Sequence, residues 1–250
     1  MMLKSNLYNL RGKTAWLIGG KRIGQIAAEV LAQHGANLIL SYRNSKKEAE
    51  TTQKSVQKFG AKTLLIRADV TSKENAENAV KQVKTKFKEI NIVISMASIF
   101  EPVKLGSIRE EDLKKNFDTH IKGTFWPVQA SLDLMPPGSH IITVSDRAAI
   151  GRMYAGYLPY IVAKGAVAYL TKALAVELAP RGIFVNSIAP GPVLKAENMG
   201  KEYWEKIRKS SIIKYPITDD EAVEEFAKLV LYLSTVRSTG SIYPLDFGNL

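Results

Sequence analysis

The fold is decided by the stretch Thr14-Ala15-Trp16-Leu17-Ile18-Gly19-Gly20-Lys21-Arg22-Ile23-Gly24. Its first five residues form an apolar run typical of a buried strand, and Gly19-Gly20 ends that run. From 23 to 34 the apolar residues recur at helical spacing, and Gly35 follows as a helix stop. Glycines between a buried strand and a helix let a phosphate approach the helix N-terminus. Taken alone, the turn serves equally well as a plain connector.

The same alternation of short apolar runs and helical periods continues along the chain. Further strands are expected at 37–40, 63–66, 90–94, 141–144, 183–188 and 242–245. Further helices are expected at 45–59, from a cap at Thr71 or Ser72 to 87, at 110–134 with a bend at Pro127, at 159–178, and from Thr218 or Asp219 to 233. Strands that are apolar on both faces and joined by helices indicate a parallel sheet covered on both sides.

We therefore expect an α/β fold with one doubly wound parallel sheet of the Rossmann type and helices on both faces. The 250 residues form a single domain in this interpretation. The stretch 192–209 is irregular in the pattern and follows the sixth strand. Ligands bind outside the carboxyl ends of the strands in such sheets, so this insertion suits a substrate lid.

The composition excludes several kinds of site. The chain has no Cys, which excludes disulfides, thiolate metal sites and a Cys nucleophile. Its three His, His34, His120 and His140, lack the spacing of metal ligands, so no metal site is expected. No apolar run approaches the roughly 20 residues that span a membrane, and residues 1–11 lack the apolar core of a secretory signal. We expect a cytoplasmic protein with no membrane partner.

The net charge is +11, from 35 Lys and Arg against 24 Asp and Glu. The densest basic run, 81–88, alternates with apolar residues at helical spacing, which indicates the solvated face of an amphipathic helix. A solvated surface is therefore favoured over a nucleic-acid patch, and no nucleic-acid partner is expected.

The end of the second expected strand bears on the cofactor. An NAD enzyme usually carries Asp or Glu there for the ribose 2′-hydroxyl, whereas an Arg accommodates a 2′-phosphate. This chain has Ser41-Tyr42-Arg43-Asn44-Ser45, without an acid. Arg43, backed by Lys21 or Arg22, favours NADP(H) through charge-assisted hydrogen bonds. The alternative is a solvated Arg in a loop.

Tyr160 and Lys164 lie four residues apart, which places them on one face of the helix expected at 159–178. A free tyrosine has a pKa of about 10, and a nearby ammonium lowers it by stabilising the phenolate. Such a pair can give a proton to a carbonyl oxygen or take one from an alcohol. A Tyr and a Lys at this spacing are common in helices. The position of this pair after the fifth strand of a dinucleotide-type sheet is what favours a catalytic role.

With these motifs the sequence resembles the short-chain dehydrogenase/reductase family over residues 10–248. The matching motifs are Asp69-Val70, Tyr160 with Lys164, Asn186-Ser187-Ile188-Ala189-Pro190-Gly191, Thr239-Gly240 and Asp246-Phe247-Gly248. The resemblance implies that Tyr160 is the catalytic acid/base, that Lys164 tunes it and bonds the nicotinamide ribose, and that the chain is a homo-oligomer, a tetramer or dimer. The expected cofactor-binding residues are Gly19, Lys21, Arg22, Ile23, Gly24, Tyr42, Arg43, Asn44, Ser45, Asp69, Val70, Met96, Ala97, Ser98, Tyr160, Lys164, Pro190, Gly191 and Val193.

The chain departs from the common family pattern near the cofactor. The glycine turn lacks its middle glycine and is one residue short, and Lys21-Arg22-Ile23-Gly24 looks like the pteridine-reductase branch, which uses NADPH. Ser95-Met96-Ala97-Ser98 stands where the family usually has Asn-Asn-Ala-Gly, and its Ala-Ser also suits that branch.

Two departures fall on the expected catalytic centre. The family's substrate-orienting Ser aligns with Asp146, and at most one of Ser145 and Asp146 can face the substrate because strand side chains alternate. We expect Asp146, which would favour a protonated or NH-rich substrate such as a pterin if ionised; the alternative is a cap of the local loop. The family's relay Asn aligns with His120, which can donate and accept a proton, or is a buried His without a role.

The leading hypothesis is an NADP(H)-dependent oxidoreductase acting on a carbonyl/alcohol pair or a pterin-like small molecule. The alternative is a dinucleotide-binding sensor or subunit without catalysis, which the lost Asn and Ser residues motivate. Nucleic-acid binding through charge ranks last, because the sequence holds no recognition module.

Overall fold

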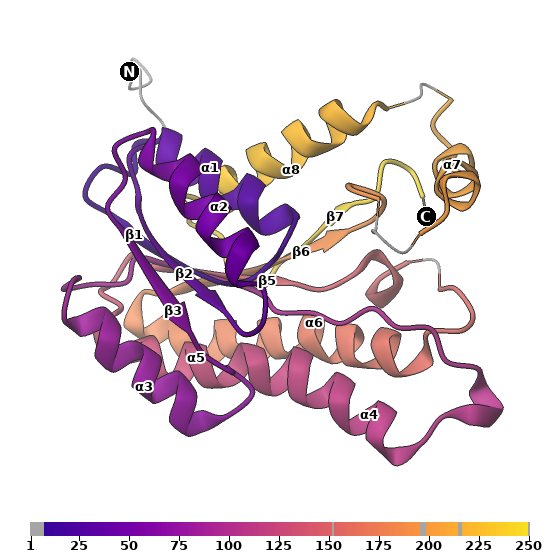
Figure 1. Cartoon of the computed structure of the whole chain (residues 1–250), viewed down its shortest axis with the longest axis horizontal. Helices are drawn as coiled ribbons and strands as arrows, with labels where there is room; N and C mark the ends of the chain where they lie inside the picture. Colours follow the sequence, from indigo (N-terminus) through magenta and orange to yellow (C-terminus); the bar gives the residue numbers. More distant parts are fainter. Residues whose placement is uncertain (1–7, 152, 196–198, 215–216, 250) are drawn as a thin grey trace.

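Seven parallel strands form one sheet in the order β3-β2-β1-β4-β5-β6-β7 (Figure 1). The computed structural model describes residues 8–151, 153–195, 199–214 and 217–249. The strands are β1 Thr14–Gly19, β2 Asn37–Tyr42, β3 Thr63–Arg67, β4 Ile92–Met96, β5 His140–Val144, β6 Phe184–Pro190 and β7 Ile242–Leu245. All seven expected strands are confirmed, with their ends shifted by a few residues.

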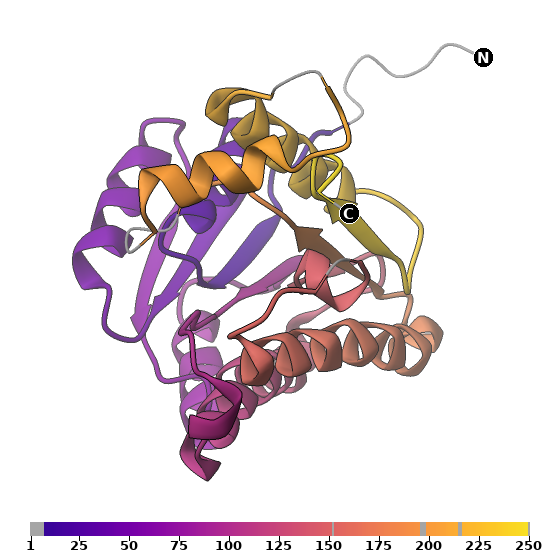
Figure 2. The same ribbon diagram turned by 90° about the vertical axis from the view of Figure 1, so that its right-hand side faces the viewer.

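Helices cover both faces of the sheet. On one face lie α1 (Ile23–Gln33), α2 (Lys46–Gln57) and α8 (Asp219–Leu233). On the other lie α3 (Lys73–Lys84), α4 (Glu110–Phe117), α5 (Gly123–Ser131) and α6 (Leu158–Leu178). Figure 2 shows α6 and the nine-residue helix α7 (Lys201–Lys209) on opposite sides of the sheet. The doubly wound parallel fold expected from the sequence is confirmed.

The apolar strands are explained by burial on both faces. In β1, Ala15 and Leu17 pack with α1 and α8, whereas Trp16 and Ile18 pack with α3 and α5. Side chains alternate along a strand, so a strand between two helical layers must be apolar at every position. This is why β1 reads as a continuous apolar run.

Two helix predictions need correction. The stretch 192–209 is not irregular throughout, because 201–209 forms α7, whose Trp204 is buried among charged neighbours; residues 196–198 lie outside the described part. The helix expected over 110–134 departs from regular geometry before Pro127: 118–122 forms a π-helical turn that ends at Gly123. The carbonyl of residue 123 is the one that the Pro127 ring crowds in a regular helix.

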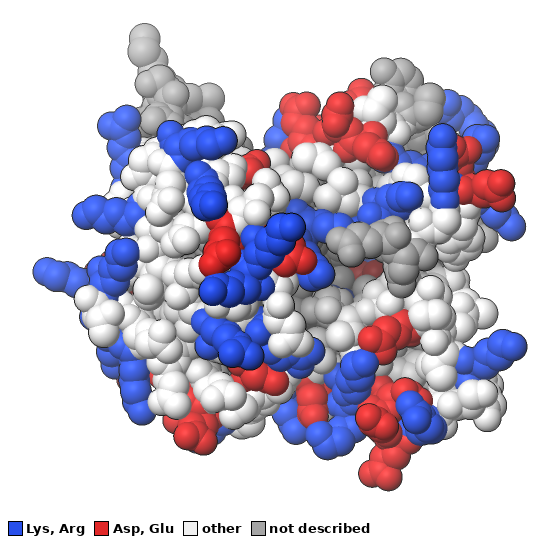
Figure 3. All heavy atoms as spheres, in the orientation of Figure 1, with Lys and Arg blue, Asp and Glu red and all other residues white. Residues whose placement is uncertain are grey.

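The charged surface mixes both signs. Figure 3 shows Lys and Arg side chains spread over this face with Asp and Glu among them. Within the residues that the structure describes, no helix combines the length and the apolar character that crossing a membrane requires.

Candidate active site

The expected site residues meet at the carboxyl edge of the sheet. The strand order reverses between β1 and β4, and the crevice beside such a reversal is where open parallel sheets bind ligands. Gly19 pairs with Met96 across this position. Apart from Tyr160 and Lys164 of α6, the residues expected to bind the cofactor lie at or just after the ends of β1, β2, β3, β4 and β6, so the parallel fold brings them to one edge.

The first turn is built from glycines in the left-handed region. Gly19 has a φ of 71° and Gly20 a φ of 89°. A Cβ at Gly20 would come within 2.9 Å of the Gly24 Cα, and one at Gly19 within 2.9 Å of the Ala97 Cα. A side chain is therefore excluded at Gly19 and at Gly20, which leaves the backbone of these two residues open near the N-terminus of α1. Ile23, the first residue of α1, packs against the core on that side of the sheet.

The three cations expected at the phosphates have separate partners. Lys21 Nζ lies 2.9 Å from Glu48 Oε1, and Arg43 Nη1 lies 3.7 Å from Asp69 Oδ2. The Arg22 guanidinium donates to the carbonyls of Leu194 and Lys195, beyond β6. Lys21 and Arg22 thus have partners on different elements of the fold in the free protein.

The other expected cofactor residues lie around these cations. Tyr42 ends β2, the exposed Arg43 and Asn44 follow it, and Ser45 precedes α2. Asp69 accepts hydrogen bonds from the backbone and hydroxyl of Thr71. The remaining members are the buried Val70 and Met96, Ala97, the exposed Ser98, and Pro190, Gly191 and the buried Val193 after β6.

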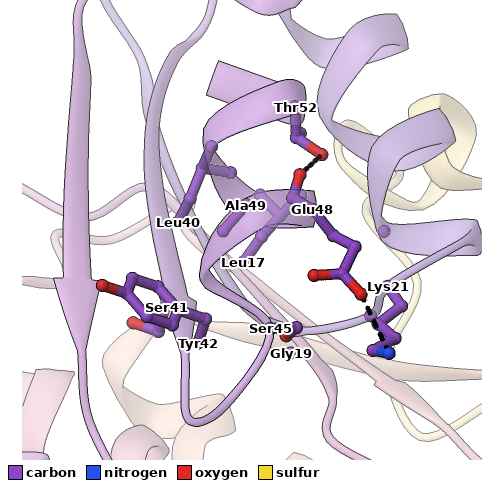
Figure 4. Close-up of a pocket in the computed structure, with 12 residues that line it drawn as sticks. Leu17, Gly19, Lys21, Leu40, Ser41, Tyr42, Ser45, Glu48, Ala49 and Thr52 are labelled. Atoms are coloured by element: carbon purple, nitrogen blue, oxygen red, sulfur yellow. Dashed lines mark hydrogen bonds and ion pairs between the residues drawn. The ribbon is translucent and has the colours of Figure 1, made fainter. Parts of the chain in front are cut away.

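A shallow hollow lies between the first turn, the end of β2 and the start of α2 (Figure 4). Gly19, Lys21, Tyr42, Ser45 and Glu48 are among its lining residues. Sequence reasoning missed Glu48, because it sought an acid at the end of the strand and this acid stands in the first turn of the next helix. The open glycine turn and the flanking cations fit a dinucleotide with phosphate groups.

The reacting end of the site is organised around Asp146. The Tyr160 hydroxyl donates to Asp146 Oδ2 at 2.7 Å, and Asp146 Oδ1 accepts from the Ala148 backbone at 2.8 Å and from the Tyr154 hydroxyl at 3.4 Å. Ser145 lies on the opposite side, where its hydroxyl donates to the Ile188 carbonyl at 3.2 Å. Of the two candidates, Asp146 is the one beside Tyr160, and it also caps the short helical turn at 147–149.

Electrostatics hold the Tyr160 hydroxyl protonated. Burial, followed by the charge of Asp146, raises its pKa well above the ordinary value. In the free protein Lys164, the residue expected to lower this pKa, donates from Nζ to the Val144 carbonyl at 2.7 Å and lies 5.8 Å from the centre of the Tyr160 ring. Burial lowers the pKa of Lys164 to about 8, while Asp146 opposes the shift.

His120 lies in the π-helical turn and is almost fully buried. Burial, with a contribution from the charge of Lys164, lowers its pKa to about 3, so the ring is neutral. Nδ1 donates to the Asn116 carbonyl at 2.9 Å, which leaves Nε2 to accept from the Ser98 hydroxyl at 3.1 Å. Its ring meets that of Tyr160 at 5.5 Å, edge to face. His120 thus connects the surroundings of Tyr160 to an exposed hydroxyl.

Aromatic rings stand beside Tyr160. Phe100 stacks on Tyr157 at 4.2 Å and meets Tyr160 edge to face at 4.9 Å. Tyr154 meets Tyr157 at 5.5 Å. Tyr154 and Tyr157 belong to the stretch 148–159, whose Tyr, Met and Gly content loosely suits an aromatic substrate pocket, whereas no pattern in the sequence marks Phe100.

A family model described as "Enoyl-(Acyl carrier protein) reductase" matches residues 20–248. General stress protein 39 of Bacillus subtilis is 32% identical over 187 residues, which cover 74% of this chain and 65% of that protein. The chain thus spans under two thirds of that relative's length. The 3-oxoacyl-[acyl-carrier-protein] reductase FabG of Staphylococcus aureus is 28% identical, covering 90% of this chain and 92% of the relative.

Solved structures with the same fold match nearly the whole chain. A short-chain dehydrogenase/reductase from Serratia marcescens has a TM-score of 0.87 and 29% identity, covering 96% of this chain and 98% of that one. A short chain dehydrogenase from Burkholderia cenocepacia in complex with NADP has a TM-score of 0.88 and 27% identity, covering 96% and 99%.

Proposed function

The chain belongs to the short-chain dehydrogenase/reductase family of oxidoreductases, and from this membership we propose that it is an NADP(H)-dependent reductase of a carbonyl or pterin-like small molecule. The observation that carries the proposal is the hydrogen bond from the Tyr160 hydroxyl to Asp146, at 2.7 Å in a buried setting. A tyrosine kept protonated is equipped to give a proton, which is what reduction requires.

The cofactor end supports NADP(H). Lys21 and Arg43 would hold the 2′-phosphate, the open turn at Gly19 and Gly20 the pyrophosphate, and Pro190, Gly191 and Val193 would flank the nicotinamide. The NADP-bound relative from Burkholderia cenocepacia is consistent with this assignment. When bound, the cofactor supplies the hydride for reduction.

The chain's own residues supply the proton. Tyr160 passes its proton to the oxygen or nitrogen of the substrate double bond that is reduced. The buried ammonium of Lys164 then stabilises the resulting Tyr160 phenolate. Asp146 orients the Tyr160 hydroxyl. His120 and the exposed Ser98 connect this buried region to solvent for the return of the proton.

The pterin-like substrate is supported by two neighbouring features. Asp146 offers carboxylate oxygens beside the Tyr160 hydroxyl, which suits a ring that donates N–H groups. Phe100 stacks on Tyr157 and meets the Tyr160 ring edge to face, so aromatic rings stand beside the reacting end, which suits a flat heterocycle.

The test is NADPH oxidation across a panel of carbonyl compounds and oxidised pterins, with cofactor binding measured in parallel. We expect turnover with at least one member of the panel and the highest kcat/KM on a pterin. Turnover on carbonyls alone contradicts the pterin assignment. Tight cofactor binding without any turnover favours the alternative, a dinucleotide-binding sensor.

We also propose that the chain forms a homo-oligomer through α4 and α6, which pack together on one face of the sheet. The outer side of α6 exposes Val162, Tyr169 and Val176 at seven-residue spacing, with Tyr169 77% exposed. Leu113 and Phe117 of α4 add two exposed apolar side chains one turn apart. Apolar side chains gathered in this way are typical of a surface that a partner covers, and a second copy of the chain is the proposed partner.

A further inference from the structure

The hollow beside the first turn is bordered by an ion pair between Lys21 and Glu48. Figure 4 shows the Glu48 side chain reaching from α2 toward Lys21, which stands on the glycine turn. The two are joined at 2.9 Å, and both are about half exposed (51% for Lys21 and 41% for Glu48). The ion pair therefore lies at a hollow that Gly19, Tyr42 and Ser45 also line.

Glu48 makes the contacts that a bound anion would make there. It lies in the first turn of α2, and the Ser45 side chain makes no capping hydrogen bond. The hydrogen bond with Lys21, followed by one with a backbone N–H of the helix, holds the pKa of Glu48 below its ordinary value. A phosphate bound at a helix N-terminus beside a lysine uses the same kinds of group.

The other cation at this end of the crevice is also near an acid. Arg43 lies 3.7 Å from Asp69, and both side chains are partly exposed. An incoming phosphate therefore meets two cations that already have carboxylate partners. Of the two acids, Glu48 is the one that lines the hollow and makes the short ion pair.

We propose that Glu48 sets the choice between the two nicotinamide dinucleotides. The ion pair between Glu48 and Lys21 stays intact when the adenosine ribose carries a 2′-hydroxyl. It must break when the ribose carries a 2′-phosphate, because the phosphate then binds Lys21. The inference rests on the proposed function, since it assumes that a nicotinamide dinucleotide occupies this crevice. It follows that Glu48 weakens NADPH binding, so that NADH remains a competitor.

The test compares dissociation constants for NADPH, NADH and 2′,5′-ADP between the wild-type protein and Glu48→Gln, by fluorescence and calorimetric titration. Glu50→Gln is the matched control: it makes the same charge change on the same helix, where Glu50 faces Lys46 at 3.6 Å and does not line the hollow. Removing a charge next to a phosphate of nearly two charges should tighten NADPH and 2′,5′-ADP by about tenfold. NADH binding should stay unchanged or weaken, and Glu50→Gln should leave all three nearly unchanged.

The variant Lys21→Met, alone and combined with Glu48→Gln, shows whether the tighter NADPH binding depends on Lys21. We expect most of the gain to disappear in the double variant, and circular dichroism checks that each variant is folded. An equal gain for NADPH and NADH, or a loss of NADPH affinity in Glu48→Gln, overturns the inference while the proposed function stands. A wild-type protein that binds none of the three ligands overturns both.

Discussion

The Tyr160 hydroxyl donates a hydrogen bond to Asp146 Oδ2 at 2.7 Å, although the two residues come from different elements of the fold. Tyr160 lies in α6 and Asp146 just beyond β5. This bond joins the proton donor of the proposed reaction to a carboxylate that raises its pKa.

Replacing Tyr160 with Phe should remove turnover and leave NADPH binding within a few-fold of wild type. The ring remains to pack against Phe100 and His120, while the transferable proton is lost. General acid catalysis contributes roughly 100- to 10,000-fold, so kcat should fall by at least that order. Steady-state rates with parallel cofactor titrations check this, and retained turnover would sink the proposed role of Tyr160.

Replacing Asp146 with Asn should move the alkaline limit of reduction to lower pH. Reduction needs protonated Tyr160, and the Asp146 charge is the second cause, after burial, of its raised pKa. Without that charge Tyr160 loses its proton at lower pH, so kcat/KM should begin to fall earlier as the pH rises. The pH profile of kcat/KM for both proteins measures the shift. A shift to higher pH, or none, would contradict the assignment.

Lys164 should make the stability of the free protein depend on pH. Its pKa is about 8 when folded and 10.5 as a free side chain. The unfolded chain therefore binds more protons between these values, and the free energy of unfolding rises as the pH increases from 8 to 10.5. The gain is about 3 kcal/mol in magnitude. Lys164→Met should lack it, and urea unfolding at a series of pH values compares the two proteins. Parallel pH dependences for the two would refute the effect.

His120 should relay protons as a neutral imidazole and should not titrate in the neutral range, because its pKa is lowered to about 3. His120→Phe keeps a ring next to Tyr160 but removes the bonds to Ser98 and Asn116. We expect kcat to fall about tenfold or more if the proton returns by this route. His34→Phe, at the end of α1, is the matched control. A lower melting temperature with unchanged kcat would assign His120 a structural role only.

Tyr169→Glu should reduce the oligomer to smaller species. Tyr169 is 77% exposed at the centre of the apolar side of α6, and a buried unpaired carboxylate is costly in an interface. Tyr203→Glu on α7, where the side chain is 50% exposed, makes the same change away from this face. Light scattering after size exclusion measures the mass, and unchanged mass for Tyr169→Glu would argue against this interface.

Local patterns predicted most of the secondary structure because buried positions are apolar, and their spacing along the chain differs between strands and helices. Residues 14–18 are apolar at every position since helices cover both sides of β1. The helix α7 left little record: Trp204 is the buried residue among its described positions, and a single buried side chain sets no period.

The sequence by itself determined the parallel sheet, the glycine turn and the pairing of Tyr160 with Lys164 on one helix, since each depends on neighbours along the chain. The alignment already favoured Asp146 over Ser145, but only the tertiary structure decided that the Tyr160 hydroxyl bonds to Asp146, that Lys164 turns to the Val144 carbonyl, and that Glu48 pairs with Lys21. These contacts join separate elements. Their distances and burial fix the protonation of the site, and no spacing along the chain encodes them.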